Sequence, residues 1–108
     1  MEVFWVPGSF EIAGTAARLA EKGGYDGILA LGCLIEGETD HYKLLATEVA
    51  KGLAKLAVEG SVPVGFGVLA THSFEDALNR AGIKAGNEGA LAMRSLIEMM
   101  DLYGQVKK

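Results

Sequence analysis

The 108-residue sequence has few of the features on which several classes of protein depend. Its single cysteine, Cys33, cannot form a disulfide within the chain, which fits a reducing compartment. Its apolar runs are far shorter than the roughly 18 residues of a membrane helix, and no basic segment followed by an apolar stretch opens the chain. We therefore expect a cytoplasmic protein with no membrane partner.

Positive charge is also scarce. The 10 Lys and Arg residues are outnumbered by 14 Asp and Glu residues, which gives a net charge of −4, and no basic cluster is denser than Lys107–Lys108. A surface that binds nucleic acid gathers cations against the phosphates. The sequence therefore predicts no nucleic-acid partner.

Hydrophobic residues and glycine are what the sequence has in quantity. Half of its residues are hydrophobic and 15 are glycine, a composition typical of a compact α/β protein rather than a disordered chain. Because 108 residues suffice for one core and no linker divides the chain, we expect one domain over residues 1–108.

The apolar patterns predict the element order β-α-β-α-β-α-α. The expected strands are 3–6, 28–35 and 62–70, and the expected helices run from Ser9 to Gly23, Asp40 to Gly60, Ser73 to Arg80 and from Asn87 onward, with Ser9, Ser73 and Asn87 as N-caps. Alternation of this kind predicts a doubly wound parallel sheet with helices on both faces. Three strands are few for such a sheet, so the chain either relies on other subunits or is part of a larger domain.

Polar and aromatic side chains follow the expected strands. Phe10 and Glu11 come after the first strand, His41 after the second and His72 after the third. The carboxyl ends of parallel strands meet at one edge, where ligands commonly bind. Histidine titrates near neutrality, so His41 could transfer protons to a small molecule in a pocket there. The alternative, that His41 only occupies the first turn of a helix, stays open.

A metal site is the less favoured interpretation of the same loop. Glu36, Glu38 and Asp40 stand beside His41 and offer suitable donor atoms. Neighbouring loop residues seldom all converge on one ion, and no second His or Cys stands nearby at a ligand spacing. We therefore expect no metal.

Three other candidates have ordinary structural explanations. Cys33 lies inside a strand, where a lone thiol is usually a small buried hydrophobe. Phe10 and Phe66 are more often core residues than ligand platforms. The segment Gly65–Ala70 matches the dinucleotide pattern G-x-G-x-x-A, but it lies within a strand instead of opening a helix.

The segment 79–89 is a second candidate site. It joins two helices and contains Arg80, Lys84 and three glycines. A guanidinium and the N–H groups of a helix start can hold a phosphate together. Solvated surface cations flanking glycine helix ends are the equally open alternative.

Four segments resemble the motif blocks of the 6,7-dimethyl-8-ribityllumazine synthase family. They are PGSFEI (7–12), ALGCLIEGETDHY (30–42), GFGVLAT (65–71) and NRAGIKAGNEGA (79–90), in the family's order and spacing. The resemblance implies a flavodoxin-like subunit of a transferase in riboflavin biosynthesis. Such an enzyme condenses 5-amino-6-ribitylaminouracil with 3,4-dihydroxy-2-butanone 4-phosphate without a metal or organic cofactor. It implies a homo-pentamer or a larger, sixty-subunit shell, with active sites between subunits.

The resemblance also implies a role for each matching residue. His41 would transfer protons, and Arg80 of a neighbouring subunit would bind the phosphate. The implied substrate-binding residues are Ser9, Phe10, Glu11, Leu34, Ile35, Glu38, Thr39, Phe66 and Lys84. Phe10 would stack on the uracil ring, and Phe66 would close the ring pocket from the neighbouring subunit.

The chain departs from the family pattern in two respects. It starts at what would be the family's second strand, so we expect a subunit without the usual amino-terminal strand, Arg-Phe-Asn loop and helix. Glu36 and Glu88 stand where the family usually has basic residues, which should weaken phosphate binding. Two alternatives therefore stay open. One is a non-catalytic lumazine synthase-like assembly or ligand-binding protein, and the other is a fragment that needs its missing segment.

Overall fold

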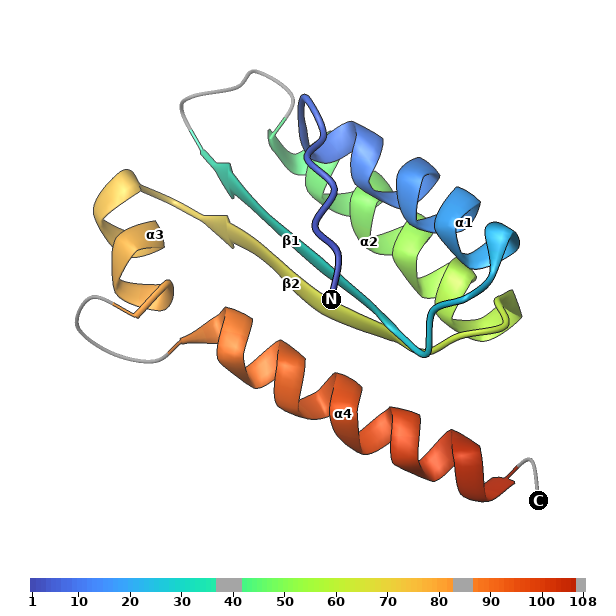
Figure 1. Cartoon of the computed structure of the whole chain (residues 1–108). Coiled ribbons are helices and arrows are strands. Elements are labelled where there is room, and N and C mark those ends of the chain that lie inside the picture. Colours follow the sequence, from blue (N-terminus) through green and yellow to red (C-terminus); the bar gives the residue numbers. More distant parts are fainter. Residues whose placement is uncertain (37–41, 83–86, 107–108) are drawn as a thin grey trace.

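The fold is built on two parallel strands. A computed structural model describes residues 1–36, 42–82 and 87–106 (Figure 1). The elements are η1 (Ser9–Glu11), α1 (Ile12–Lys22), β1 (Ile28–Ile35), α2 (Tyr42–Glu59), β2 (Val64–Thr71), α3 (Phe74–Arg80) and α4 (Glu88–Val106). β1 and β2 pair in continuous register from Ile28↔Val64 to Ile35↔Thr71. The expected α/β class with a parallel sheet is confirmed.

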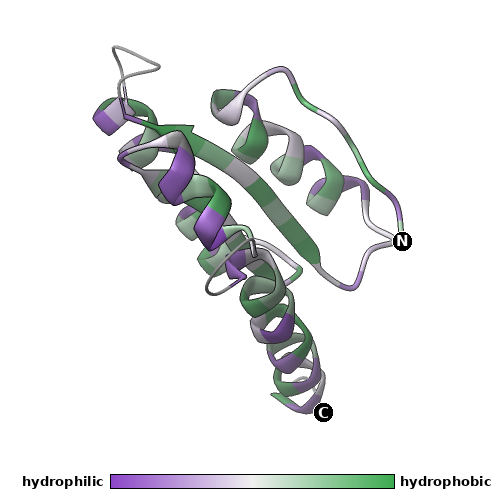
Figure 2. Ribbon diagram, turned by 90° about the vertical axis from the view of Figure 1, so that its left-hand side faces the viewer, coloured by the Kyte–Doolittle hydropathy of each residue, from purple (hydrophilic) through white to green (hydrophobic). Residues whose placement is uncertain are grey.

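Helices cover both faces of the strand pair. A Cβ placed on Gly32 would lie 2.9 Å from Cδ1 of Ile12 in α1, whereas one placed on Gly65 would lie 3.1 Å from Cβ of Leu96 in α4. α1 and α2 therefore lie on one face and α4 on the other, as Figures 1 and 2 show. No helix in the described part of the chain is both long and apolar enough to cross a membrane.

The main core lies between the strands and the pair α1 and α2. It consists of Ile12, Ala16, Ala30, Val49 and Leu53, each no more than 8% exposed. Alanine and glycine let these elements approach closely, because neither has a side chain beyond Cβ. The two helices that the apolar periodicity of the sequence predicted thus supply Ile12 and Ala16 from α1 and Val49 and Leu53 from α2.

The expected first strand, Val3–Val6, is wrong. Residues 1–6 have no regular secondary structure, and the described sheet has only the strands β1 and β2. A β-prone segment becomes a strand only when its N–H and C=O groups pair with a neighbouring strand. Here side chains hold the segment instead, through a contact to Tyr25.

Tyr25 makes this contact with both its ring and its hydroxyl group. The hydroxyl donates a hydrogen bond to Oε1 of Glu2 at 2.9 Å, and the ring meets that of Phe4 edge-on, with centroids 6.4 Å apart. The hydrogen bond to Glu2, more than burial or charge, raises the pKa of Tyr25 above its ordinary value.

Two of the three expected N-caps, Ser73 and Asn87, are confirmed. The Ser73 hydroxyl accepts a hydrogen bond from the Asp76 N–H at 3.1 Å, and Oδ1 of Asn87 accepts one from the Ala90 N–H at 3.0 Å. The expected cap at Ser9 is wrong, because the chain forms a 3₁₀ turn over Ser9–Glu11 and α1 begins only at Ile12, without a side-chain cap.

The start of β2 also differs from expectation. β2 begins at Val64 rather than Val62. Pro63 lies just before the first paired residue, so its missing N–H costs the strand no hydrogen bond, and its carbonyl accepts one from the Ile28 N–H at 3.0 Å. α2 begins at Tyr42, and the expected start at Asp40 lies outside the described residues.

Gly52 tests the close approach of α1 and α2. A Cβ placed on Gly52 would lie 2.8 Å from Cβ of Ala13, and neither atom can rotate away. Gly52→Ala should lower the free energy of unfolding by about 1–3 kcal/mol, because overpacking outweighs the roughly 1 kcal/mol that alanine gains over glycine in a helix.

The matched control is Gly104→Ala in α4, where a Cβ would meet nothing within 4 Å. It should leave stability unchanged or raise it slightly. Urea denaturation of both variants measures the difference, and equal stability of the two variants would contradict the packing argument.

Candidate active site

The carboxyl ends of the two strands lie level with each other. Ile35 and Thr71 form the last strand pair, and the next backbone N–H, that of Glu36, donates to the Thr71 carbonyl at 2.8 Å. Residues just beyond both strands are therefore neighbours. The common edge that the sequence predicted is confirmed for β1 and β2.

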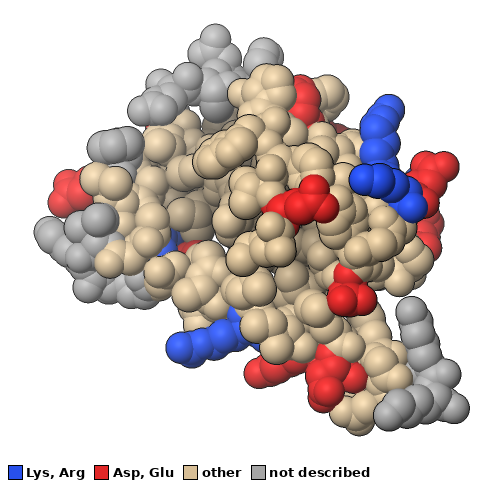
Figure 3. Space-filling model, in the orientation of Figure 1, with Lys and Arg blue, Asp and Glu red and all other residues tan. Residues whose placement is uncertain are grey.

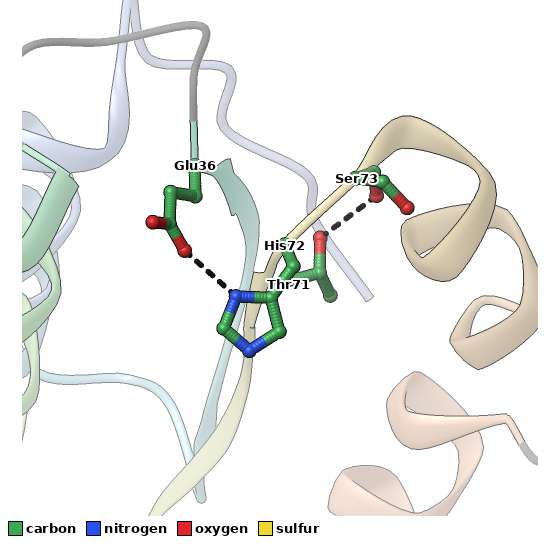
Figure 4. A network of polar contacts seen from close by, with 4 residues as sticks. All are labelled: Glu36, Thr71, His72 and Ser73. Atoms are coloured by element: carbon green, nitrogen blue, oxygen red, sulfur yellow. Dashed lines mark hydrogen bonds and ion pairs between the residues drawn. The ribbon is translucent and has the colours of Figure 1, made fainter.

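A polar contact bridges this edge. Nδ1 of His72 lies 2.7 Å from Oε2 of Glu36, and the two side chains are 84% and 49% exposed (Figure 4). Beside it, the buried Thr71 hydroxyl donates to the Ser73 carbonyl at 3.2 Å. A pair this exposed contributes little stability, but it links the residues at which both strands end. The sequence predicted His72 at this edge but did not pair it with Glu36. The pair could have been predicted from the equal positions at which the two strands end.

Ser9, Phe10 and Glu11 form the short η1 turn beside β1. Ser9 is half-buried, and its hydroxyl lies 3.7 Å from where a Cβ on Gly32 would be. Phe10 is 69% exposed, because the chain anchors Ile12 in the core and turns the preceding ring outward. The expectation that Phe10 is a core residue is wrong. Its ring and the exposed Glu11 are accessible to a ligand.

Leu34 and Ile35 lie at the carboxyl end of β1. The Leu34 side chain is 6% exposed and Ile35 is half-buried. What Leu34 can offer a ligand is therefore its backbone.

Cys33, between Gly32 and Leu34, is exposed, so its expected burial is wrong. Leu31 on the same face of β1 is 57% exposed as well. Both follow from the position of α4, which lies chiefly over β2 (Figure 1).

A hollow of about 310 Å³ lies against β2, between the end of α3 and the start of α4. The segment 66–70 lines it, together with Arg80 and Glu88. Phe66 is 51% exposed, so the expectation that it belongs to the core is wrong. The structure thus brings together the two residues, Phe66 and Arg80, that the resemblance gives to the same half of an active site.

The hollow offers a ligand three kinds of contact. Arg80 supplies a charged, bidentate hydrogen-bond donor, Glu88 a carboxylate of opposite charge, and the segment 66–70 a wall formed by β2. The G-x-G-x-x-A pattern lies in β2, so its expected assignment to a strand is confirmed. The part of it from Phe66 onward forms the wall of the hollow.

Charge on the surrounding surface is mixed. On the face shown in Figure 3, the described Lys and Arg residues are scattered among acidic ones and do not form a continuous patch. Among the described residues that line the hollow, Arg80 is the one with a positive charge.

Four expected site residues lie outside the described residues: Glu38, Thr39, His41 and Lys84. The acidic loop considered as a metal site also falls there, apart from Glu36. Among the residues the structure does describe, no three His, Cys, Asp or Glu side chains come together as a metal-binding group.

The expected site residues fall into two groups within one chain. Ser9, Phe10 and Glu11 precede α1, which packs on one face of the strands, whereas Arg80 ends α3 and lines the hollow with Phe66. The residues of η1 do not line the hollow. The expected site residues therefore form two separate groups on one chain, and each group would be a partial site.

These features define an α/β chain in which two parallel strands end at a common polar edge and a hollow lined in part by Arg80 lies against β2. The profile of the 6,7-dimethyl-8-ribityllumazine synthase family matches residues 1–104. Proteins named 6,7-dimethyl-8-ribityllumazine synthase from Pediococcus pentosaceus and Limosilactobacillus reuteri are similar to the chain. They are 49% identical over 102 residues and 48% identical over 106 residues, respectively.

The chain belongs to the 6,7-dimethyl-8-ribityllumazine synthase family. The two alignments cover 94% and 98% of the chain. They span 65% of the length of the Pediococcus protein and 70% of that of the Limosilactobacillus protein. The resemblance found in the four sequence blocks is confirmed.

Asn87 tests how the start of α4 is held at the hollow. Asn87→Ala removes the acceptor for the Ala90 N–H and should lower the free energy of unfolding by about 1 kcal/mol. Asn87→Asp keeps an acceptor and should stay close to the wild type. Thermal unfolding of both variants checks this, and equal losses would show that the cap does not hold the helix start.

Proposed function

We propose that this chain is a subunit of a 6,7-dimethyl-8-ribityllumazine synthase, a transferase acting in riboflavin biosynthesis. Its substrates would be 5-amino-6-ribitylaminouracil and 3,4-dihydroxy-2-butanone 4-phosphate. Family membership supports the reaction class, and the joint position of Phe66 and Arg80 in one hollow is the observation that carries the site assignment. The proposal includes no metal or organic cofactor and no nucleic-acid or membrane partner.

The chemistry of such a condensation suits the residues proposed for it. Imine formation, phosphate elimination and ring closure each move protons, and His41 is proposed for that task because a histidine ordinarily titrates near neutrality. The departing phosphate needs a cation, which Arg80 supplies. Much of the acceleration would come from holding the two reactants together. This requires a pocket of the right shape and stacking on Phe10 and Phe66, and no further reactive groups.

The proposal includes a homo-oligomer whose sites lie between subunits. Support comes from the two partial sites of the single chain, which complement each other only if a second copy brings its hollow to the η1 turn. A pentamer, or a sixty-subunit shell built from pentamers, is the expected assembly, and the cytoplasm is the expected location. The remaining substrate contacts proposed are those of Ser9, Glu11, Leu34, Ile35, Glu38, Thr39 and Lys84.

A non-catalytic family member that binds a ligand is the second candidate. The observation that favours it is the presence of a carboxylate both in the hollow and at the strand ends. Glu88 shares the hollow with Arg80, and Glu36 meets His72 at the strand ends. Turnover assays on the whole chain with both substrates, followed by fluorescence of the lumazine product, distinguish a synthase from a binding protein.

Arg80→Ala tests the phosphate role. If the guanidinium binds the phosphate of the butanone substrate, the KM for that substrate should rise at least about tenfold, since a charge-assisted bidentate contact contributes on the order of 1.5–3 kcal/mol. The KM for the uracil substrate should stay within about twofold. Lys55→Ala in α2 is the control for loss of a surface cation, and equal effects on both substrates would argue against a phosphate role.

His41→Ala tests the proton-transfer role. Loss of a general acid–base group should lower kcat by about 10²-fold or more, with little change in either KM. Steady-state kinetics measure this, with His72→Ala as the control for an imidazole at the same edge. Unchanged kcat in His41→Ala would defeat the assignment.

A further inference from the structure

The hollow beside β2 combines a cation with a carboxylate that the proposed reaction does not use. Arg80 is the last residue of α3 and is exposed, while Glu88 is the first residue of α4 and is half-buried. Both line the same hollow of about 310 Å³. A carboxylate in that position is unfavourable for a bound anion, so its presence calls for an explanation.

Arg80 and Glu88 do not neutralise each other by direct contact. The one ion pair found within 4.0 Å among the described residues joins His72 to Glu36. The guanidinium therefore keeps its donors for a ligand, while the carboxylate acts on that ligand across the hollow. This differs from an Arg–Glu salt bridge, which would close the cation off.

Glu88 also stands in the first turn of α4. A helix start carries partial positive charge, and a carboxylate there is favourable for the helix. The same carboxylate thus opposes both sources of attraction for an anion at this hollow, the guanidinium and the helix start. Stabilising the helix start would not by itself require the Glu88 carboxylate to line the hollow.

We infer that Glu88 lowers the affinity of the Arg80 hollow for a phosphate group, so that free phosphate is not retained there. The phosphate group of a substrate meets the same repulsion, but the rest of the substrate provides further contacts that free phosphate lacks. Free phosphate has only the ionic contacts and is not retained. The choice of phosphate as the anion rests on the proposed function. The choice of Glu88 rests on its position in the lining of the hollow.

The test is the binding of inorganic phosphate to the whole chain, measured by calorimetry for the wild type, Glu88→Gln, Glu88→Asp and Glu98→Gln. Glu98 is an exposed residue of α4, about 15 Å further along the helix, and controls for general loss of a negative charge. Glu88→Asp keeps the charge. Thermal unfolding of each variant shows whether the helix start is intact.

Glu88→Gln should bind phosphate about fivefold more tightly than the wild type, the change that a Coulomb interaction of about 1 kcal/mol produces. Glu98→Gln should change binding less than about 1.5-fold, and Glu88→Asp should resemble the wild type. The gain should shrink as salt is raised. Adding Arg80→Gln to Glu88→Gln should abolish binding.

Equal affinity of Glu88→Gln and Glu98→Gln would overturn the inference, as would the absence of phosphate binding from every variant. Turnover is measured separately. A chain that shows the fivefold gain but forms no lumazine would retain the inference about Glu88 and lose the proposed reaction, so the two failures are distinguishable.

Discussion

The parallel pairing of β1 with β2 is the interaction on which the rest of the structure depends. Its unbroken register from Ile28↔Val64 to Ile35↔Thr71 makes both strands end at the same level. Glu36 and His72 become neighbours for this reason alone, and the helix that follows β2 begins at the same edge. The pairing also decides which side chains of each strand face α1 and α2 and which face α4. The candidate site is therefore a consequence of the register.

Small residues let the layers come close enough for that site to form. Glycine at position 32 makes room for Ile12 and Ser9, which places the η1 turn against β1. Glycine at position 67 lies against Ala92 of α4, and the adjoining stretch of β2 is left to form the wall of the hollow. The high glycine content of the sequence predicted a compact protein. In the structure, individual glycines allow close contacts between the strands and the helices that cover them.

The sequence predicted those parts of the fold that depend on local pattern. Periodicity located α1, α2, α4 and both strands, and side-chain chemistry located the caps at Ser73 and Asn87. It failed at Val3–Val6, where strand formation depends on a partner that composition cannot reveal. It also failed at Ser9, where a 3₁₀ turn competes with a helix cap. The burial of Phe10, Cys33 and Phe66 was misjudged because hydrophobicity predicts average burial, whereas the position of α4 and the turn before Ile12 decide it here.

For the candidate site, the sequence supplied the residues but not their grouping. Arg80 was one of two cations in a loop, with a surface role equally open, until the structure placed it beside Phe66 and Glu88. No local pattern joins position 66 to position 88, because only the packing of α4 on β2 brings them together. The separation of this hollow from the η1 turn likewise appears only in three dimensions, and it is the basis for a site shared between chains.

The measurement that tests this account most directly is a subunit-mixing assay. A double variant, Phe10→Ala with Glu11→Ala, and a separate Arg80→Ala variant are each assayed for lumazine formation, then dissociated together and reassembled. If each site takes its η1 turn from one chain and its hollow from another, random 1:1 mixing should restore about a quarter of wild-type activity from two nearly inactive proteins. Activity no greater than the mean of the two variants would contradict a shared site, and would place both partial sites within a single chain.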